Sequence, residues 1–354
     1  MAAAQAPQSQ VPTGADHQPP LVTAGMGFFH GQNIANLNIH SILLEYAAPG
    51  GHKVIGKGVF IMIPYVPEGV NATPPDADEL RRGLGTGQIF QAMCVKCDEF
   101  HNLHLQLKDT RAIIPREEAA LGIREGSVKE IAVLSRVGKW VCFQALGFDS
   151  RGTAILSRRA AQAEAKHYFL NTLRPGDVIP AVVLNAAPFG VFCDIGCGCT
   201  ALMRIDRCCI SRLSTTAEHF APGQRIHAAV LCVDDAEGFI HLTGRELLGT
   251  WEENAALFRP GQTVTGFARS IMPYGVFIEL TPNLSGLAEP AVPVAQGDPV
   301  SVYIRSIQPE RHKMKLTVLE RLKEPVGPNL NYFIAGGHLD KWEYYPGSSA
   351  VTYF

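Results

Sequence analysis

The sequence predicts an all-β protein built from tandem five-stranded barrels, joined by short helical linkers and preceded by a disordered region. Three observations lead to this fold class. Two long stretches of the chain repeat each other, each stretch divides into short β-branched and apolar runs between glycine turns, and the segments between repeats are Ala-rich or carry a helix-capping pattern. The chain has 354 residues, enough for two or three domains of this kind.

The repeat is clearest between "LRPGDVIPAVVLNAAPFGVFCDIG" and "FRPGQTVTGFARSIMPYGVFIELT". Both begin with an Arg-Pro-Gly step, and both contain an aromatic-Gly-Val-Phe motif. Phe189 and Phe192 of the first copy lie 85 residues before Tyr274 and Phe277 of the second. Two separated matches in one register indicate a repeated structural unit. The three cysteines close to Phe192 have no counterpart in the second copy, so the repeated unit does not need them.

Each copy reads as five short strands. "DVIPAVVLNAA" and "TVTGFARSIM" follow a glycine turn, and "GVFCDI" and "GVFIEL" predict a second strand. "ALMRI" and "SGLAEP" begin a third, a second glycine turn introduces a fourth, and "GFIHLT" and "HKMKLTV" close the unit. This pattern is typical of a small closed barrel.

A weaker third copy lies upstream, where "FHNLHLQL" replaces the aromatic motif. The predicted boundaries are a lead-in segment at 62–84, a degenerate barrel at 85–160, two further barrels at 173–247 and 259–320, and an aromatic C-terminal tail at 321–354. The linkers "RRAAQAEAKHYFLNTL" and "GTWEENAALF" are predicted helices, and Thr250 and Glu253 have the spacing of a capping box.

Residues 1–61 are expected to lie outside the folded unit. The first 26 residues are low in complexity, and only four charged residues occur through Ile61. We therefore expect disorder, or an extension upstream of a true start at Met62. Two alternatives are a flexible N-terminal arm that anchors to a partner, and a strand pair in "HKVIGKGVFIMIPYV" that joins the first barrel.

The repeated residues resemble the S1 RNA-binding domain family, whose fold is the OB-fold barrel. The resemblance covers roughly residues 85–320. The motifs that carry it are Gly176-Asp177-Val178, Phe189-Gly190-Val191-Phe192, Ala201-Leu202-Met203, Gly223-Gln224, Ile240-His241-Leu242-Thr243, Gly261-Gln262-Thr263, Tyr274-Gly275-Val276-Phe277, Gly286-Leu287, Gly297-Asp298 and Lys315-Leu316-Thr317. The whole chain resembles short multi-domain S1-like proteins of Gram-positive bacteria.

This resemblance implies single-stranded RNA binding through an aromatic pair, a residue on the third strand and polar or basic residues near the fifth. The corresponding residues are Phe189, Phe192, Arg204, Asp235 and His241 in the second unit, and Tyr274, Phe277, Lys313 and Lys315 in the third. Phe239 also lies near the fifth strand of the second unit, with Asp235 and His241. Glu289 occupies the third-strand position of the third unit, where it would repel phosphate. The first unit has Pro115 there and lacks the pair, so we expect it to be structural.

The spacing of the aromatic pair raises a geometric question. Phe189 and Phe192 have opposite parity, so a regular strand would point their rings to opposite faces. A glycine between them permits a bulge that would turn the first ring towards the second. Two exposed rings could then stack adjacent bases. The alternative is that one or both rings belong to the core.

Composition limits the classes of partner and the cellular location that the chain can have. The chain has 31 basic and 33 acidic side chains and a formal net charge of −2, so it lacks the strongly basic field that holds duplex DNA through phosphates alone. No Lys or Arg precedes Lys53, so the charged region of a secretory signal is missing, and no apolar run has the length of a membrane span. We therefore expect a cytoplasmic protein with no membrane partner.

The nine cysteines are expected to be reduced. A zinc site at Cys197, Cys199, Cys208 and Cys209 and a redox sensor are alternatives, but the ligand spacing departs from the usual pair of CxxC motifs, and small buried residues or free thiols are the preferred interpretation. Twelve histidines prompt a search for catalysis, but no HExxH, GxSxG or P-loop occurs. The sequence therefore predicts no enzyme and no cofactor.

These observations favour an array of RNA-binding modules that acts in translation by holding mRNA near the small ribosomal subunit. Two other functions stay open. The chain could be an accessory subunit of an RNA-processing or isoprenoid enzyme, or a structural adaptor whose barrels contact only protein. Exposed aromatic pairs would favour RNA binding over the adaptor, and a co-purifying ribosome or nuclease would separate the first two functions.

Overall fold

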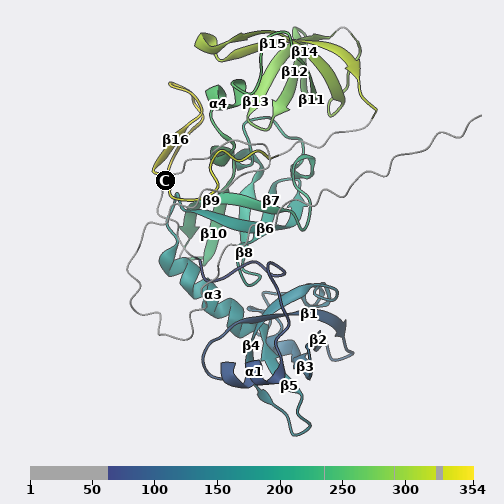
Figure 1. Ribbon diagram of the computed structural model, residues 1–354, viewed down its shortest axis with the longest axis vertical. Coiled ribbons are helices and arrows are strands. Elements are labelled where there is room, and N and C mark those ends of the chain that lie inside the picture. The colour runs from purple at the N-terminus through teal and green to yellow at the C-terminus, as the bar shows by residue number, and fades with distance from the viewer. Residues whose placement is uncertain (1–62, 235, 291, 324–329) are drawn as a thin grey trace, which may run out of the picture. The chain divides into compact units, whose positions relative to one another are not determined.

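The computed structural model describes residues 63–234, 236–290, 292–323 and 330–354. The expectations about residues 1–61, and about a start at Met62, fall outside these residues. Three closed five-stranded barrels follow one another along the described chain (Figure 1). The predicted fold class of tandem barrels joined by short helices is therefore confirmed.

The three barrels share one topology. In each, the first strand pairs with the second and the fourth, and the third strand pairs in parallel with the fifth, which closes the sheet. The strands of the first barrel are β1 (Phe90–Cys97), β2 (Leu103–Gln106), β3 (Arg111–Ile114), β4 (Trp140–Phe148) and β5 (Ala154–Ser157). Those of the second are β6 (Val178–Ala187), β7 (Gly190–Asp194), β8 (Thr200–Arg204), β9 (Arg225–Asp234) and β10 (Phe239–Thr243). Those of the third are β11 (Thr263–Met272), β12 (Gly275–Thr281), β13 (Leu284–Pro290), β14 (Pro299–Gln308) and β15 (Lys313–Arg321).

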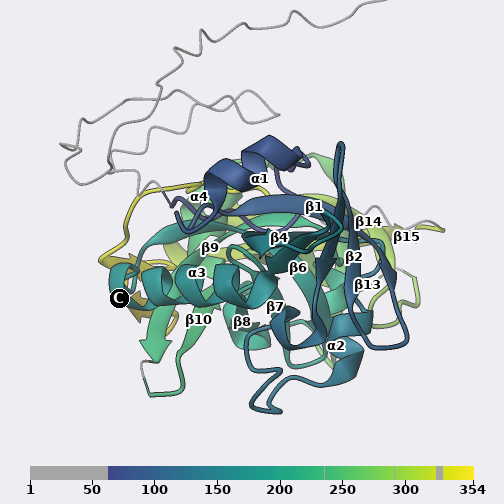
Figure 2. The same cartoon turned by 90° about the horizontal axis from the view of Figure 1, so that it is seen from below.

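Short helices occupy the connections. They are α1 (Ala77–Gly83), α2 (Glu130–Leu134), α3 (Arg158–Thr172) and α4 (Trp251–Ala255), with one-turn 3₁₀ helices η1 (Arg116–Glu118), η2 (Ile205–Arg207), η3 (Thr216–Glu218), η4 (Arg245–Leu248) and η5 (Pro309–Arg311). Thr250 and Glu253 form the predicted capping box of α4. The Ala-rich linker is α3 (Figure 2). Its buried Ala161, Ala165 and Phe169 pack into the core of the second barrel.

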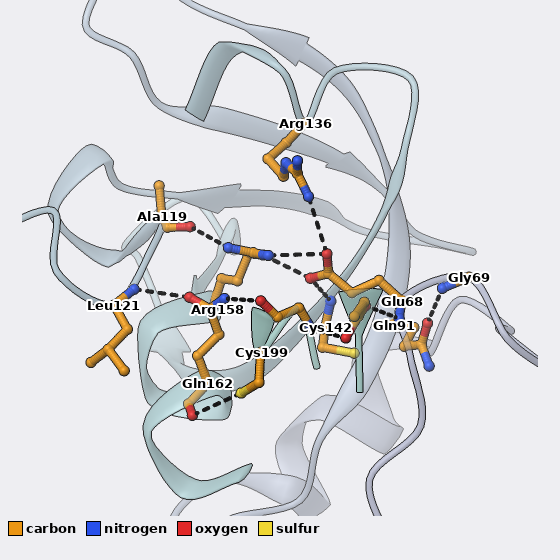
Figure 3. Close-up of polar contacts among 12 residues, drawn as sticks. Glu68, Gly69, Gln91, Ala119, Leu121, Arg136, Cys142, Arg158, Gln162 and Cys199 are labelled. Atoms are coloured by element: carbon orange, nitrogen blue, oxygen red, sulfur yellow. Dashed lines mark hydrogen bonds and ion pairs between the residues drawn. The ribbon is translucent and has the colours of Figure 1, made fainter. Parts of the chain in front are cut away.

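A buried ion pair fastens the lead-in segment to the start of α3 (Figure 3). Arg158 donates from Nε to Glu68 Oε1 (2.7 Å) and from Nη2 to Glu68 Oε2 (3.0 Å), and both side chains are 6% exposed. The Glu68 carboxylate also accepts from the backbone N–H of Cys142 in β4 and from Arg136. On the next turn of α3, Gln162 Oε1 accepts from the N–H of Leu121. Residues of the lead-in segment, the first barrel and α3 therefore share one hydrogen-bonded network.

Residues 330–354, termed here the C-terminal segment, return to the second and third barrels. The N–H of Val178 in β6 donates to Gly337 O (3.0 Å), and His338 Nδ1 lies 2.7 Å from Asp177 Oδ1. Further on, β16 (Lys341–Glu343) and β17 (Val351–Tyr353) form a small hairpin. Trp342 and Tyr344 of this hairpin join the core of the third barrel.

The cysteines are free thiols, and six of the nine are buried. Burial raises the pKa of the Cys193 thiol to about 12 and raises that of Cys208 as well, so neither thiol is ionised near neutral pH. Within the described ranges, no three His, Cys, Asp or Glu side chains gather in an arrangement that could hold a metal ion. Among the same residues, no helix combines the length and the apolar character that crossing a membrane requires.

Candidate nucleic-acid interface

The aromatic pair of the second barrel stands at the hairpin between β6 and β7. Ala187 pairs with Gly190, so Pro188 and Phe189 form a two-residue turn, and Phe192 lies on β7. The Phe189 side chain is 59% exposed, and Phe192 is half-buried. Their ring centroids are 5.9 Å apart with the planes at 87°, an edge-to-face contact. Both rings are therefore outside the core, next to each other.

The predicted bulge beside Gly190 is wrong. The irregularity lies in the partner strand β6, between Val183 and Asn185, and β7 itself is regular through Phe192. Phe189 reaches the same face as Phe192 because it belongs to the turn, where the alternation of a strand does not apply. The third barrel repeats this arrangement, with Tyr274 in the turn before β12 and the irregularity in β11.

The glycine of the motif is required by close packing between strands. A Cβ atom at Gly190 would lie 2.8 Å from Met203 O and 2.9 Å from Leu202 Cδ1, both on the neighbouring β8. At Gly275 the corresponding atom would lie 2.7 Å from Ala288 O, and the backbone φ there is +147°. The aromatic-Gly-Val-Phe motif therefore combines an exposed ring with a backbone that a neighbouring strand approaches closely.

We expect Gly190→Ala to destabilise the second barrel by about 1–3 kcal/mol, because the added methyl group forces β7 away from β8. Chemical denaturation of the variant and the parent protein measures this difference. Gly223→Ala is the control, since a Cβ atom at Gly223 would meet no atom within 4 Å and only its left-handed backbone (φ +85°) is strained. A Gly190→Ala variant as stable as the parent would contradict the close approach of the two strands.

Three strands align their outward side chains into one row on the second barrel. Phe192 on β7 is paired with Leu202 on β8, and Leu202 is paired with His241 on β10. The ring of Phe239 contacts His241 with centroids 5.3 Å apart. The residues Phe189, Phe192, Leu202, His241 and Phe239, termed here the aromatic row, therefore form a continuous strip across the barrel.

The third barrel has a corresponding row, in which a lysine replaces the histidine. Tyr274 is 66% exposed and meets Phe277 edge to face, with centroids 6.4 Å apart. Phe277 pairs with Leu287, and Leu287 pairs with Lys315. Lys315 therefore stands where the second barrel has His241. Lys313 lies two residues away on β15, and both lysines are exposed.

The two third-strand residues are both held by ion pairs at the surface. Arg204 Nε lies 3.0 Å from Asp206 Oδ1, and the Glu289 carboxylate accepts from Arg305 Nη1 at 2.9 Å. The charge of Glu289 is thus partly offset, which weakens the expected repulsion of phosphate. Asp235, the remaining predicted site residue, lies outside the described residues.

Curated relatives supply an independent comparison. Small ribosomal subunit protein bS1 of Rhodopseudomonas palustris is 24% identical over 311 residues, which cover 80% of this chain and 54% of that protein. The bS1 homolog of Bacillus subtilis is 26% identical over 198 residues, which cover 51% of this chain and 52% of the homolog. The chain is similar to bacterial ribosomal protein S1. It spans about half the length, or less, of the curated relatives it matches.

No family model matches the chain. A solved multidomain protein with nucleic acid binding domains from Streptococcus pneumoniae aligns with 69% of this S1-like chain and 76% of its own, at 16% identity and a TM-score of 0.24.

The first barrel departs from the other two at the candidate interface. Pro115 directly follows β3 and is the N-cap of η1, just as Arg204 is the N-cap of η2 after β8. The β1–β2 connection runs through residues 98–102 in place of a two-residue turn. Asp98 organises this connection. Desolvation raises the pKa of its carboxyl, but hydrogen bonds from Asn102, His104 and Phe100 outweigh it and lower the pKa to about 2.

Several side chains on or near the candidate interface were not among the predicted site residues. Leu202 and Leu287 bridge the rows, and Tyr303 and Arg305 stand exposed on β14. A signal for the last two was present, because Tyr303 and Arg305 are two residues apart in a strand and share a face. The bridging leucines depend on strand register, which the sequence pattern alone does not determine.

Proposed function

We propose that this chain binds single-stranded RNA across its second and third barrels, and that it acts without catalysis by holding mRNA near the small ribosomal subunit in the cytoplasm. The observation that carries the proposal is the pair of exposed, edge-to-face aromatic contacts at equivalent turns. Each pair opens a row that continues over three strands, to His241 in one barrel and to Lys315 in the other.

The chemistry of the rows favours a single strand over a duplex. Bases can stack on aromatic rings only when they are unpaired, and each stacked base contributes roughly 1–3 kcal/mol. The chain as a whole has a net charge of −2, so a purely electrostatic hold on a duplex has little support. The small ribosomal subunit is proposed because the curated relatives are named as its proteins.

We expect the full chain to bind a single-stranded oligoribonucleotide at least about tenfold more tightly than a duplex of the same sequence, because only the single strand offers free base faces. Fluorescence anisotropy with one labelled strand, alone or annealed, measures both affinities under identical salt. Equal affinity for the two forms would contradict stacking, and the absence of RNA binding would overturn the proposal and favour the adaptor that contacts only protein.

Association with the small subunit is tested separately by co-sedimentation with ribosomes in low and in high salt. We expect the chain to sediment with the small-subunit fraction at low salt. Its absence from that fraction in the presence of mRNA would overturn the ribosomal part of the proposal and leave RNA binding standing.

A further inference from the structure

A cavity of about 280 Å³ lies between α3, the second barrel and the segment around α2. Three cationic side chains line it, Arg136, Arg158 and Lys166. The Glu68 carboxylate, which is not part of this lining, forms ion pairs with both arginines. The ring of Phe239 forms part of the wall. Its size is near the lower end of the range for small-molecule pockets, and it suits one nucleotide better than a larger ligand.

The three cationic side chains differ in how many hydrogen bonds they already make within the protein. Arg158 is held by both oxygens of Glu68 (Figure 3), so it contributes to the wall but has little hydrogen-bonding capacity left. Arg136 makes only a 3.4 Å bond to Glu68 and a 3.3 Å bond to Ser135, and its Nε is buried without a partner among the described residues. A buried, unpaired guanidinium nitrogen is costly unless a ligand supplies an acceptor.

Lys166 provides the second available cation. No carboxylate among the described residues forms an ion pair with it, and its ammonium group lies against Gly238, where a Cβ atom would be 2.9 Å from Lys166 Nζ. Gly238 is the residue before Phe239 at the start of β10. Lys166 on α3 is thus positioned beside the end of the aromatic row.

The row and the cavity therefore meet at Phe239, which contacts His241 on one side and lines the cavity on the other. We propose that this cavity binds the backbone phosphate of the RNA nucleotide that follows the bases on the aromatic row, with Lys166 as its direct phosphate ligand and Arg136 as a further positive charge in the cavity wall. This inference rests on the proposed RNA-binding function. It gives α3 a role in binding as well as in joining two barrels, and it supplies the second barrel with cations that its own row lacks.

The test uses the full chain and single-stranded RNA, with affinity measured over a range of salt concentrations. Lys166→Gln should weaken binding about tenfold, because it removes a charge-assisted bond to phosphate. It should also make the salt dependence of log K shallower by about 0.7, the value for one phosphate contact on a single strand. Lys139→Gln, at an exposed lysine of the first barrel, is the control.

A second pair of variants tests the cavity without touching a proposed ligand. Ala132 is exposed at the rim, so Ala132→Glu places a negative charge there, and Ala132→Gln places a side chain of nearly the same shape without charge. Only Ala132→Glu should weaken RNA binding. Affinities and salt slopes of Lys166→Gln and Ala132→Glu that match their controls would overturn the inference, while loss of binding on removing the aromatic pair would still support the proposed function.

Competition with adenosine monophosphate and with inorganic phosphate tests whether the cavity binds a phosphate of an RNA strand or a free small ligand. We expect both compounds to compete only weakly with RNA. Tight binding of adenosine monophosphate that is lost in Lys166→Gln, with RNA affinity unchanged, would assign the cavity to a free nucleotide and overturn the inference. Failure of the parent protein to bind RNA would remove the proposed function itself.

Discussion

Single-stranded RNA binding is expected to weaken by at least about 1–3 kcal/mol when Phe189 and Phe192 are both replaced by alanine, because each ring offers a stacking surface for one base. Phe189 is 59% exposed in a turn, and Phe192 is half-buried on the outer face of β7, so the fold should tolerate the change. Anisotropy titrations give the affinity, and thermal denaturation shows whether the second barrel is intact.

The same experiment has a matched control within the chain. Phe100 is 70% exposed in the first barrel, which lacks the aromatic pair, so Phe100→Ala should leave RNA affinity unchanged. Tyr274→Ala with Phe277→Ala should reproduce the loss in the third barrel. Unchanged affinity in a folded Phe189→Ala/Phe192→Ala variant would count decisively against the proposed interface.

The largest effect on stability is expected from Arg158→Ala, at about 3–5 kcal/mol, because the variant removes the bidentate partner of the buried Glu68 carboxylate and leaves it only the 3.4 Å contact to Arg136 and one backbone N–H. Both side chains are 6% exposed, and two hydrogen bonds join them. Denaturant titration, monitored by tryptophan fluorescence, measures the loss. The double variant Glu68→Leu/Arg158→Met should recover only part of it, since the apolar pair removes two buried charges but leaves Arg136 and the N–H of Cys142 without the Glu68 carboxylate.

An exposed pair provides the comparison. Arg116 and Glu130 also form an ion pair, but their side chains are 44% and 38% exposed, so Arg116→Ala should cost no more than about 1 kcal/mol. If Arg158→Ala costs as little as Arg116→Ala, the network around Glu68 does not stabilise the folded chain.

Much of the fold could be predicted because its signals are local or repeated. Glycine turns, β-branched runs and the recurrence of Phe189 and Phe192 at Tyr274 and Phe277 indicate tandem barrels from the sequence alone. The capping box at Thr250 is likewise a local pattern, and it was confirmed.

The features that were not predicted depend on register or on distant pairing. The sequence pattern predicts a bulge at Gly190 that turns Phe189 towards Phe192. In the structure, Phe189 lies in a two-residue turn, and the irregularity lies in the partner strand β6. Leu202 joins the row only because β8 lies between β7 and β10. The hydrogen bond between Arg158 and Glu68 joins residues 90 positions apart in the chain, and no periodic pattern in the sequence predicts such a distant pair.

The C-terminal segment has a consequence for how the protein is made. Val178 and Leu247 of the second barrel are covered by residues that are synthesised much later, and the bond between Asp177 and His338 joins positions 161 apart. At roughly 5–20 residues per second, a growing chain leaves this apolar surface uncovered for roughly 5–20 s after the second barrel has emerged. During that interval the nascent second barrel offers a transient binding surface to chaperones and to neighbouring nascent chains. The pace of translation through the third barrel therefore sets how long the unfinished protein is at risk of aggregation.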